Sequence, residues 1–172
     1  NISISSDGSI VAIGAVENDG NGSNSGHVRV YENLGGVWTQ IGEDIDGEAI
    51  GDGSGNSVSI SENGSIVAIG ARLNDENGVD SGHVKVYENL VGVWTQIGQD
   101  IDGEMADDRS GWSIELSADG GIVAIGSPFN DGNGDLSGNV RVYENLDGVW
   151  TQMGADIDGE TIGDLSGFSV SL

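Results

Sequence analysis

The chain has 172 residues, of which 29 are acidic and only five are basic, so its formal net charge is −24. Nucleic acids and anionic membranes require a cationic surface, so this charge argues against both as partners and favours divalent cations. No cysteine is present, which excludes a disulfide framework and thiol chemistry, and no stretch approaches the ~18 apolar residues of a membrane span.

The sequence repeats itself with a period of 56 residues, because the equivalent residues Trp38, Trp94 and Trp150 recur at that spacing. The phrase VYENLxGVWTQ appears once in each copy, and the phrase DIDGE follows it each time. We expect three units, at 1–56, 57–112 and 113–168, with 169–172 beginning a further copy. A sequence that begins and ends at the same point of its repeat is what we expect of a segment from a longer array.

Within the middle unit, residues 57–61 alternate serine with Val or Ile, and residues 66–71 form a continuous apolar run suited to a strand covered on both faces. Residues 83–88 alternate again, and residues 93–98 form a fourth run around a tryptophan. The turn Glu62-Asn63-Gly64 predicts a tight hairpin between the first two runs. No helix is predicted, so each unit should be a four-stranded antiparallel sheet.

Four short antiparallel strands per period indicate a blade of a β-propeller, an all-β fold. A parallel β-helix is disfavoured, because its coils are much shorter than this period. Three blades leave an open ring, so closure requires further blades of the same chain or self-association, for instance of two chains; an open stacked array is the other arrangement.

The repeat unit SGxSV, IVAIG[A/S] and GxVxVY resembles the FG-GAP repeat, in particular its bacterial variant, and the best copy combines residues 126–128, 138–143 and 166–170. The resemblance implies a propeller of about seven blades, within the usual range of four to eight. Such proteins are usually displayed outside the cell in adhesion or recognition, and integrin α-subunit heads share the blade. The calcium loop of that family lies between the first two strands, where this chain has only Asp7-Gly8 and its equivalents, so those calcium ligands do not carry over.

The loop between the second and third strands is the first candidate for Ca²⁺, which prefers carboxylate, amide and carbonyl oxygens on a flexible backbone. The alternative is a solvated loop that uses Asn, Asp and Gly for its turns. The candidate ligands are Asp19, Asn21, Asp75, Asn77, Asp131 and Asn133.

The acidic linker that follows each tryptophan strand is the second candidate. Its carboxylates repel one another unless water or a cation lies between them, so it is either an exposed acidic rim or a cation site between adjacent blades. The candidate ligands are Asp46, Glu48, Asp102, Glu104, Asp158 and Glu160, with Asp44, Asp100 and Asp156 before them and Asp52, Asp107 and Asp164 after them.

The repeated tryptophans could stack on a sugar, but their fixed place in a strand favours packing between blades. The position of Trp112 varies among the copies, with Asn56 and Phe168 at the equivalent places, which indicates peripheral packing. His27 and His83 are replaced by Asn139 in the third copy, so we interpret them as strand-surface residues.

Catalysis needs non-equivalent groups brought together, and no such group stands out from the repeat. We therefore predict a non-catalytic binding or adhesion module with an unidentified protein or glycan ligand, stabilised by Ca²⁺. Acidity, lack of cysteine and the family resemblance together predict an extracellular or cell-surface location. The alternative is a structural array, filament or spacer with no dedicated ligand, which the near-identity of the copies favours.

Overall fold

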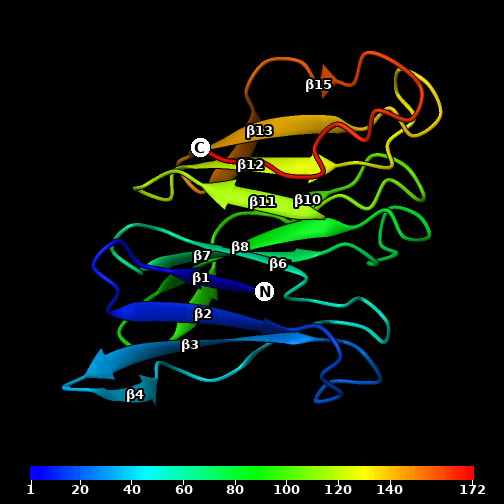
Figure 1. Ribbon diagram of the computed structural model, residues 1–172. Helices are drawn as coiled ribbons and strands as arrows, with labels where there is room; N and C mark the ends of the chain where they lie inside the picture. The colour runs from blue at the N-terminus through cyan, green and yellow to red at the C-terminus, as the bar shows by residue number, and fades with distance from the viewer.

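The computed structural model describes all residues 1–172. It consists of three β-sheets that lie side by side in chain order, and it has no helix (Figure 1). No segment is therefore a helix that could cross a membrane. The expected all-β architecture of propeller blades is confirmed.

The strands of the three sheets occupy equivalent positions in the repeat. The first sheet contains β1 (Ile2–Ile4), β2 (Ile10–Ala15), β3 (His27–Leu34), β4 (Val37–Gln40) and β5 (Ile45–Asp46). The second contains β6 (Ser57–Ile60), β7 (Ile66–Ala71), β8 (His83–Asn89), β9 (Trp94–Gln96) and β10 (Ile101–Asp102). The third contains β11 (Ser113–Leu116), β12 (Ile122–Ser127), β13 (Asn139–Leu146), β14 (Val149–Gln152) and β15 (Ile157–Asp158).

Every strand pair within the sheets is antiparallel, and the first four strands of each unit pair with their neighbours in chain order. The linker adds a fifth strand of two residues, which was not predicted: β5 pairs with the start of β3, at His27 and Val28, while β4 pairs with its end. Ile45 is buried in the core, which explains why this short segment pairs with β3 and does not lie in solvent as an exposed acidic rim.

The first strands of the three sheets lie next to one another, β1 beside β6 and β6 beside β11 (Figure 1). Their serines link the sheets: Ser3 Oγ accepts a hydrogen bond from Ile60 N at 3.1 Å, and Ser59 Oγ accepts one from Leu116 N at 3.0 Å. The alternation of serine with apolar residues in these strands therefore places hydroxyl groups where neighbouring blades need polar contacts.

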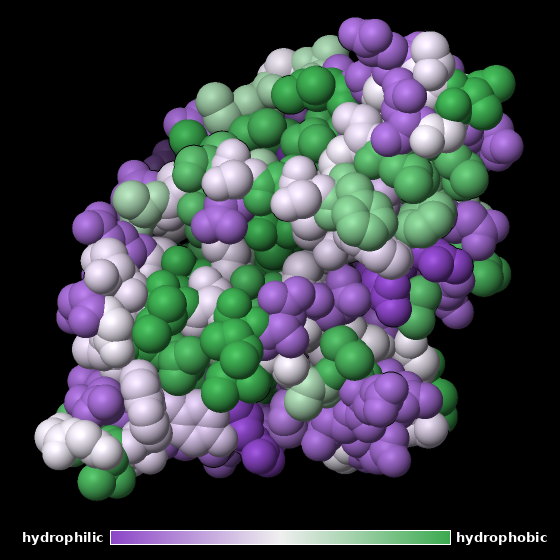
Figure 2. Space-filling model, viewed as in Figure 1, coloured by the Kyte–Doolittle hydropathy of each residue, from purple (hydrophilic) through white to green (hydrophobic).

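The core consists of two apolar clusters, one between each pair of adjacent sheets. The equivalent residues Ile13, Ile69 and Ile125 are 36%, 3% and 0% exposed. Ile13 is the most exposed because no sheet packs on that face of the first sheet. The opposite face of the third sheet is open too, and Ile157 is 58% exposed there. Hydrophobic side chains also reach the surface over the strands in Figure 2, whereas the loops at its lower right are hydrophilic.

The glycine one residue before the end of each second strand is required by close packing of backbones. A Cβ atom on Gly70 would collide with the carbonyl oxygen of Gly111, which belongs to the connection into the third sheet. Gly111 itself has a positive φ of 79°. The repeated glycines thus let each connection cross directly over the second strand of the preceding sheet.

Candidate functional site

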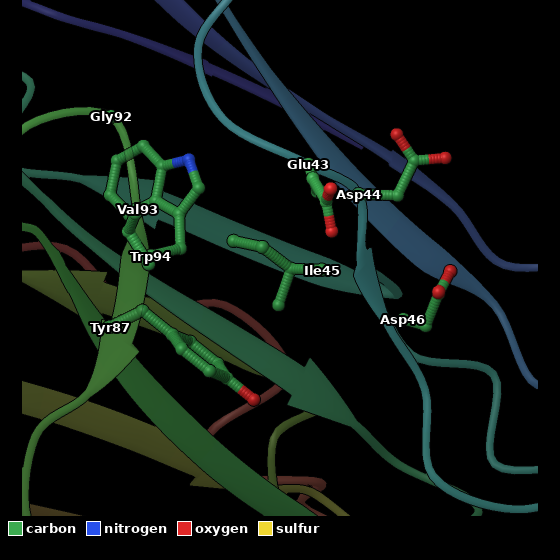
Figure 3. Close-up of a pocket in the computed structure, with 8 residues that line it drawn as sticks. All are labelled: Glu43, Asp44, Ile45, Asp46, Tyr87, Gly92, Val93 and Trp94. Carbon is green, nitrogen blue, oxygen red and sulfur yellow. The ribbon is translucent and has the colours of Figure 1, made fainter.

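The largest pocket lies between the first and second sheets and has a volume of about 620 Å³ (Figure 3). One wall is the segment that leads into β5, and the other is formed by the end of β8 and the start of β9. In Figure 3, Ile45 points from the first wall toward the rings of Tyr87 and Trp94. The lining residues are Glu43, Asp44, Ile45, Asp46, Tyr87, Gly92, Val93 and Trp94.

The tryptophan of this pocket anchors the second sheet to the first, because Trp94 Nε1 donates a hydrogen bond to the carbonyl of Ile41 at 2.9 Å. Trp150 makes the equivalent bond to Ile97 at 2.9 Å and is buried. Trp38 has no preceding sheet to contact and is 46% exposed. Packing between blades, as predicted, is therefore the role of the two tryptophans at the sheet junctions.

The aromatic residues at the equivalent place between the second and third sheets, Tyr143 and Trp150, are buried, whereas Tyr87 and Trp94 are partly exposed. Gln99 Nε2 donates a hydrogen bond to Trp150 O at 2.8 Å, and Gln99 Oε1 accepts one from Trp150 N at 3.2 Å. Glu43 occupies the position of Gln99 in the first repeat, and a carboxylate cannot donate to the carbonyl of Trp94. The exchange of one amide for one carboxylate thus coincides with an open pocket at the first junction.

Arg29 fixes the carboxylate of Asp44, which lines this pocket. The guanidinium donates from Nε to Oδ1 at 2.8 Å and from Nη2 to Oδ2 at 2.7 Å, and Gln40 donates to Oδ1 at 2.7 Å. The Arg29 hydrogen bonds lower the pKa of Asp44 to about 2, so the carboxylate stays ionised. Burial raises the pKa of the Tyr87 phenol, which therefore stays neutral.

The acidic linkers reach across to the next sheet, which the sequence alone could not reveal. Glu48 contacts the ammonium of Lys85 in β8, and that ammonium lies 3.2 Å from Asp100 Oδ2. Glu104 lies 3.9 Å from Arg141 in β13. The basic residue of the third strand thus pairs with the glutamate of the preceding linker.

The other linker candidates are dispersed. Asp46 is exposed and joins His27 and Asp44 in one cluster, while Asp102 is half-buried. Asp158 and Glu160 are exposed at the open face of the third sheet, where no fourth sheet brings a cation to them.

The prediction that Asp107 is the final carboxylate of the second linker is wrong. Asp108, and not Asp107, is equivalent to Asp52: its Oδ2 accepts hydrogen bonds from Met105 N at 2.9 Å and from Asn130 at 3.1 Å. Burial raises the pKa of Asp108.

The candidate calcium ligands of the loops between the second and third strands form hydrogen bonds to the backbone of the loop or of the following linker. The aspartates each accept a bond from a backbone NH five residues later, as Asp75 does from Asp80 at 2.8 Å. The asparagines each donate to a carbonyl of the following linker, as Asn77 does to Gly103 at 2.7 Å. Asp19, Asp131, Asn21 and Asn133 make the same contacts in their repeats. Calcium binding by these residues stays a prediction.

The prediction that the two histidines lie at the strand surface is wrong, because both are buried. His27 and His83 are only 5% and 4% exposed, because the short linker strands β5 and β10 cover them. His27 Nδ1 lies 3.4 Å from Asp44 Oδ2, whereas the buried Nδ1 of His83 has no hydrogen-bond partner. Burial lowers the pKa of His83, which favours the neutral imidazole.

Trp112 packs at the periphery, as predicted, at a position that differs in all three repeats. Its ring centroid is 5.2 Å from that of Phe129 and 5.3 Å from that of Phe168, and the guanidinium of Arg72 lies 4.6 Å above it. The first repeat has Asn56 in place of this tryptophan, and the corresponding space between the first two sheets is hollow.

Comparison with known protein structures agrees with the propeller arrangement. A candidate 6-phosphogluconolactonase from Bacteroides uniformis is 14% identical, with a TM-score of 0.60, over 91% of this chain and 39% of its own. A hypothetical selenium-binding protein from Sulfolobus tokodaii is 13% identical, with a TM-score of 0.59, over 92% of this chain and 41% of its own. Hydrazine synthase from Kuenenia stuttgartiensis is 13% identical, with a TM-score of 0.53, over 92% of this chain and 36% of its own.

At these identities the likeness concerns the fold alone, and the chain spans about two fifths of the length of these structures. No curated protein sequence matches the chain. Residues 44–87, which run from the first linker into β8, match the family model of the FG-GAP repeat. The chain therefore contains a segment that matches the FG-GAP repeat, and the other two repeats have the same strands in the same register, as expected for consecutive propeller blades.

Proposed function

We propose that the chain is part of a non-catalytic binding module, and that the pocket between its first two sheets receives a positively charged group of a partner protein. The observation that carries this proposal is the open pocket itself. Two aromatic rings, Tyr87 and Trp94, face the carboxylate-bearing segment that contains Glu43, and the equivalent pocket at the next junction is closed by Gln99.

The chemistry of the lining favours an ammonium or guanidinium group. Such cations are attracted to the faces of tryptophan and tyrosine, and the attraction increases when the group is partly desolvated. Three of the eight lining residues are carboxylates, and Arg29 neutralises only that of Asp44. The net charge of −24 would also raise the local concentration of basic partners and speed their association.

The absence of catalysis is part of the proposal. The FG-GAP repeat supports a binding role, and the lactonase name belongs to a structure that is 14% identical. Adhesion at the cell surface, stabilisation by Ca²⁺ and closure by further blades or by self-association belong to the same proposal. The family resemblance and the two open sheet faces support them.

A structural array is the second candidate, and the same open faces favour it. Ile13 on one face and Ile157 on the other are exposed, so one copy could stack on the next without a dedicated ligand. Light scattering of the purified chain over a range of concentrations distinguishes growing assemblies from a closed or monomeric form.

The binding proposal is tested by titrating the chain with choline chloride and with argininamide while tryptophan fluorescence is recorded. Sodium chloride at equal ionic strength is the reference. We expect saturable binding to the wild type and at least tenfold weaker binding to Glu43→Gln, because the amide restores the bridge that closes the other junction. Asp147→Asn, in an exposed turn of the third sheet, removes the same charge and should bind as the wild type does. Equal affinity in Glu43→Gln would refute the assignment of this pocket.

A further inference from the structure

A second site lies at the same junction and is made of different residues. Glu48 of the first linker, Glu76 of the loop before β8, His83 at the start of β8 and Asp100 before β10 each offer a ligand atom. These four atoms lie within 4.8 Å of one another. We propose that this cluster, termed the junction cluster, binds a divalent transition metal of the Zn²⁺ class and clamps the first sheet to the second.

The buried histidine points to a missing partner. His83 is 4% exposed, and its Nδ1 atom has no hydrogen-bond partner within the chain. Leaving a buried polar atom without a partner is unfavourable, so a group that could pair with it would stabilise the folded chain. In the first repeat the equivalent atom of His27 has Asp44 Oδ2 at 3.4 Å. A metal ion in the junction cluster would give the imidazole of His83 the partner that it lacks.

The charges of the junction cluster also call for another cation. Glu48, Glu76 and Asp100 bring three negative charges together, and the half-buried Asp102 adds a fourth close by. Lys85 supplies a single positive charge, through its contacts with Glu48 and Asp100. A divalent ion would offset most of the remaining repulsion.

The donor set distinguishes this metal from calcium. One imidazole with three carboxylates suits Zn²⁺ and its neighbours, whereas Ca²⁺ takes oxygen ligands only. The donors of a tetrahedral zinc site lie roughly 3.4 Å apart, so the four side chains must draw together slightly. Glu48 and Glu76 are exposed, although Glu48 also contacts Lys85, and they line an open depression of about 360 Å³ that gives access from solvent.

The junction cluster occurs once in the chain, because Glu76 is specific to the middle repeat and the histidine is missing from the third repeat. Glu76 is replaced by Gly20 and Gly132 in the other repeats, and His83 is replaced by Asn139 in the third. The chain therefore supplies its own control substitutions, since Glu76→Gly and His83→Asn introduce residues that the same fold already holds at equivalent positions.

The test is isothermal titration of the metal-free chain with ZnCl₂, accompanied by thermal melts with and without Zn²⁺. We expect one Zn²⁺ per wild-type chain and a higher midpoint of unfolding in its presence. Glu76→Gly and His83→Asn should each weaken binding at least tenfold, while their melts without metal show that they fold. His27→Asn, in the equivalent position of the first repeat, should bind as the wild type does.

Three outcomes would overturn the proposal: no binding by the wild type, unchanged affinity in both Glu76→Gly and His83→Asn, or loss of binding in His27→Asn instead. A titration with CaCl₂ adds a further check, because the proposal requires His83→Asn to weaken Zn²⁺ binding far more than any Ca²⁺ binding. Neither substitution alters a residue that lines the pocket with Trp94. Failure of the metal proposal is therefore distinguishable from failure of the proposed cation pocket.

Discussion

Gln99 holds the backbone of Trp150 with two hydrogen bonds, donating to its carbonyl at 2.8 Å and accepting from its NH at 3.2 Å. The two residues are 51 positions apart and belong to neighbouring sheets. At the first junction Glu43 faces Trp94 from the same position, and no such bridge is present. The exchange of an amide for a carboxylate thus accompanies the difference between the buried Trp150 and the partly exposed Trp94.

Replacement of Gln99 by Glu should destabilise the second junction. The carboxylate can still accept from Trp150 N, but the carbonyl of Trp150 loses its donor, so we expect the free energy of unfolding to fall by about 1 kcal/mol. Urea unfolding monitored by fluorescence measures the change. Gln99→Ala removes both bonds and should cost at least as much; a Gln99→Glu variant as stable as the wild type would show that the bridge is irrelevant.

The ion pair between Arg29 and Asp44 makes stability depend on pH at the acidic end. Because the folded-state pKa of Asp44 is lowered to about 2, its stabilising contribution is present above the unfolded pKa of ~3.9 and is lost as the pH falls toward 2. Replacing Arg29 by Met should raise the pKa of Asp44 toward its ordinary value. Carboxyl NMR titration measures both values, and an unchanged pKa would exclude Arg29 as the cause.

Gly70→Ala should destabilise the chain by about 1–3 kcal/mol, because the added methyl group meets the backbone of Gly111 and neither can move freely. Gly121→Ala is the control: its Cβ would make ordinary contacts, and the equivalent residues in the other repeats are Ser9 and Ser65. Chemical denaturation of both variants tests the difference. Equal stability would contradict the close crossing of the two backbones.

Excess Ca²⁺ should raise the midpoint of thermal unfolding above that in sodium chloride of equal ionic strength, if the acidic loops hold calcium as proposed. A ligand at one hundred times its Kd stabilises the folded state by about 2.7 kcal/mol. Asp75→Asn should reduce the shift, while His83→Asn should leave it intact. A midpoint that does not move with Ca²⁺ or a chelator would leave Asp75 and its equivalents as loop-closing residues only.

The repeat and its main strands could be predicted from the sequence because alternation and turn residues are local signals. The apolar run at 66–71 became β7 with those bounds. The run at 93–98 shortened to Trp94–Gln96, because Val93 exchanges hydrogen bonds with Leu90 in the turn and Ile97 keeps only one backbone bond, to Val86. The strand β10 was missed, because two residues show no periodicity and their pairing depends on the distant start of β8.

The pocket and the junction cluster are both formed by residues of two neighbouring sheets. Comparing the repeats in the sequence does not show which residues meet across a junction. His83 was placed on the surface because alternation alone cannot show that the linker folds back over β8. Glu48 meets Lys85 of the next repeat, a pair that only the relative placement of two sheets defines. One signal was available: positions 43 and 99 differ, Glu against Gln, within otherwise similar copies.

The most direct test of the proposed binding pocket is a residue exchange that preserves composition and net charge, Glu43→Gln combined with Gln99→Glu. Indole NH signals of Trp94 and Trp150 are followed by NMR during a titration with choline chloride. We predict that the ligand shifts the Trp94 signal in the wild type and the Trp150 signal in the exchanged chain. A ligand that still shifts Trp94 after the exchange, or that shifts neither signal in the wild type, would contradict the proposed site.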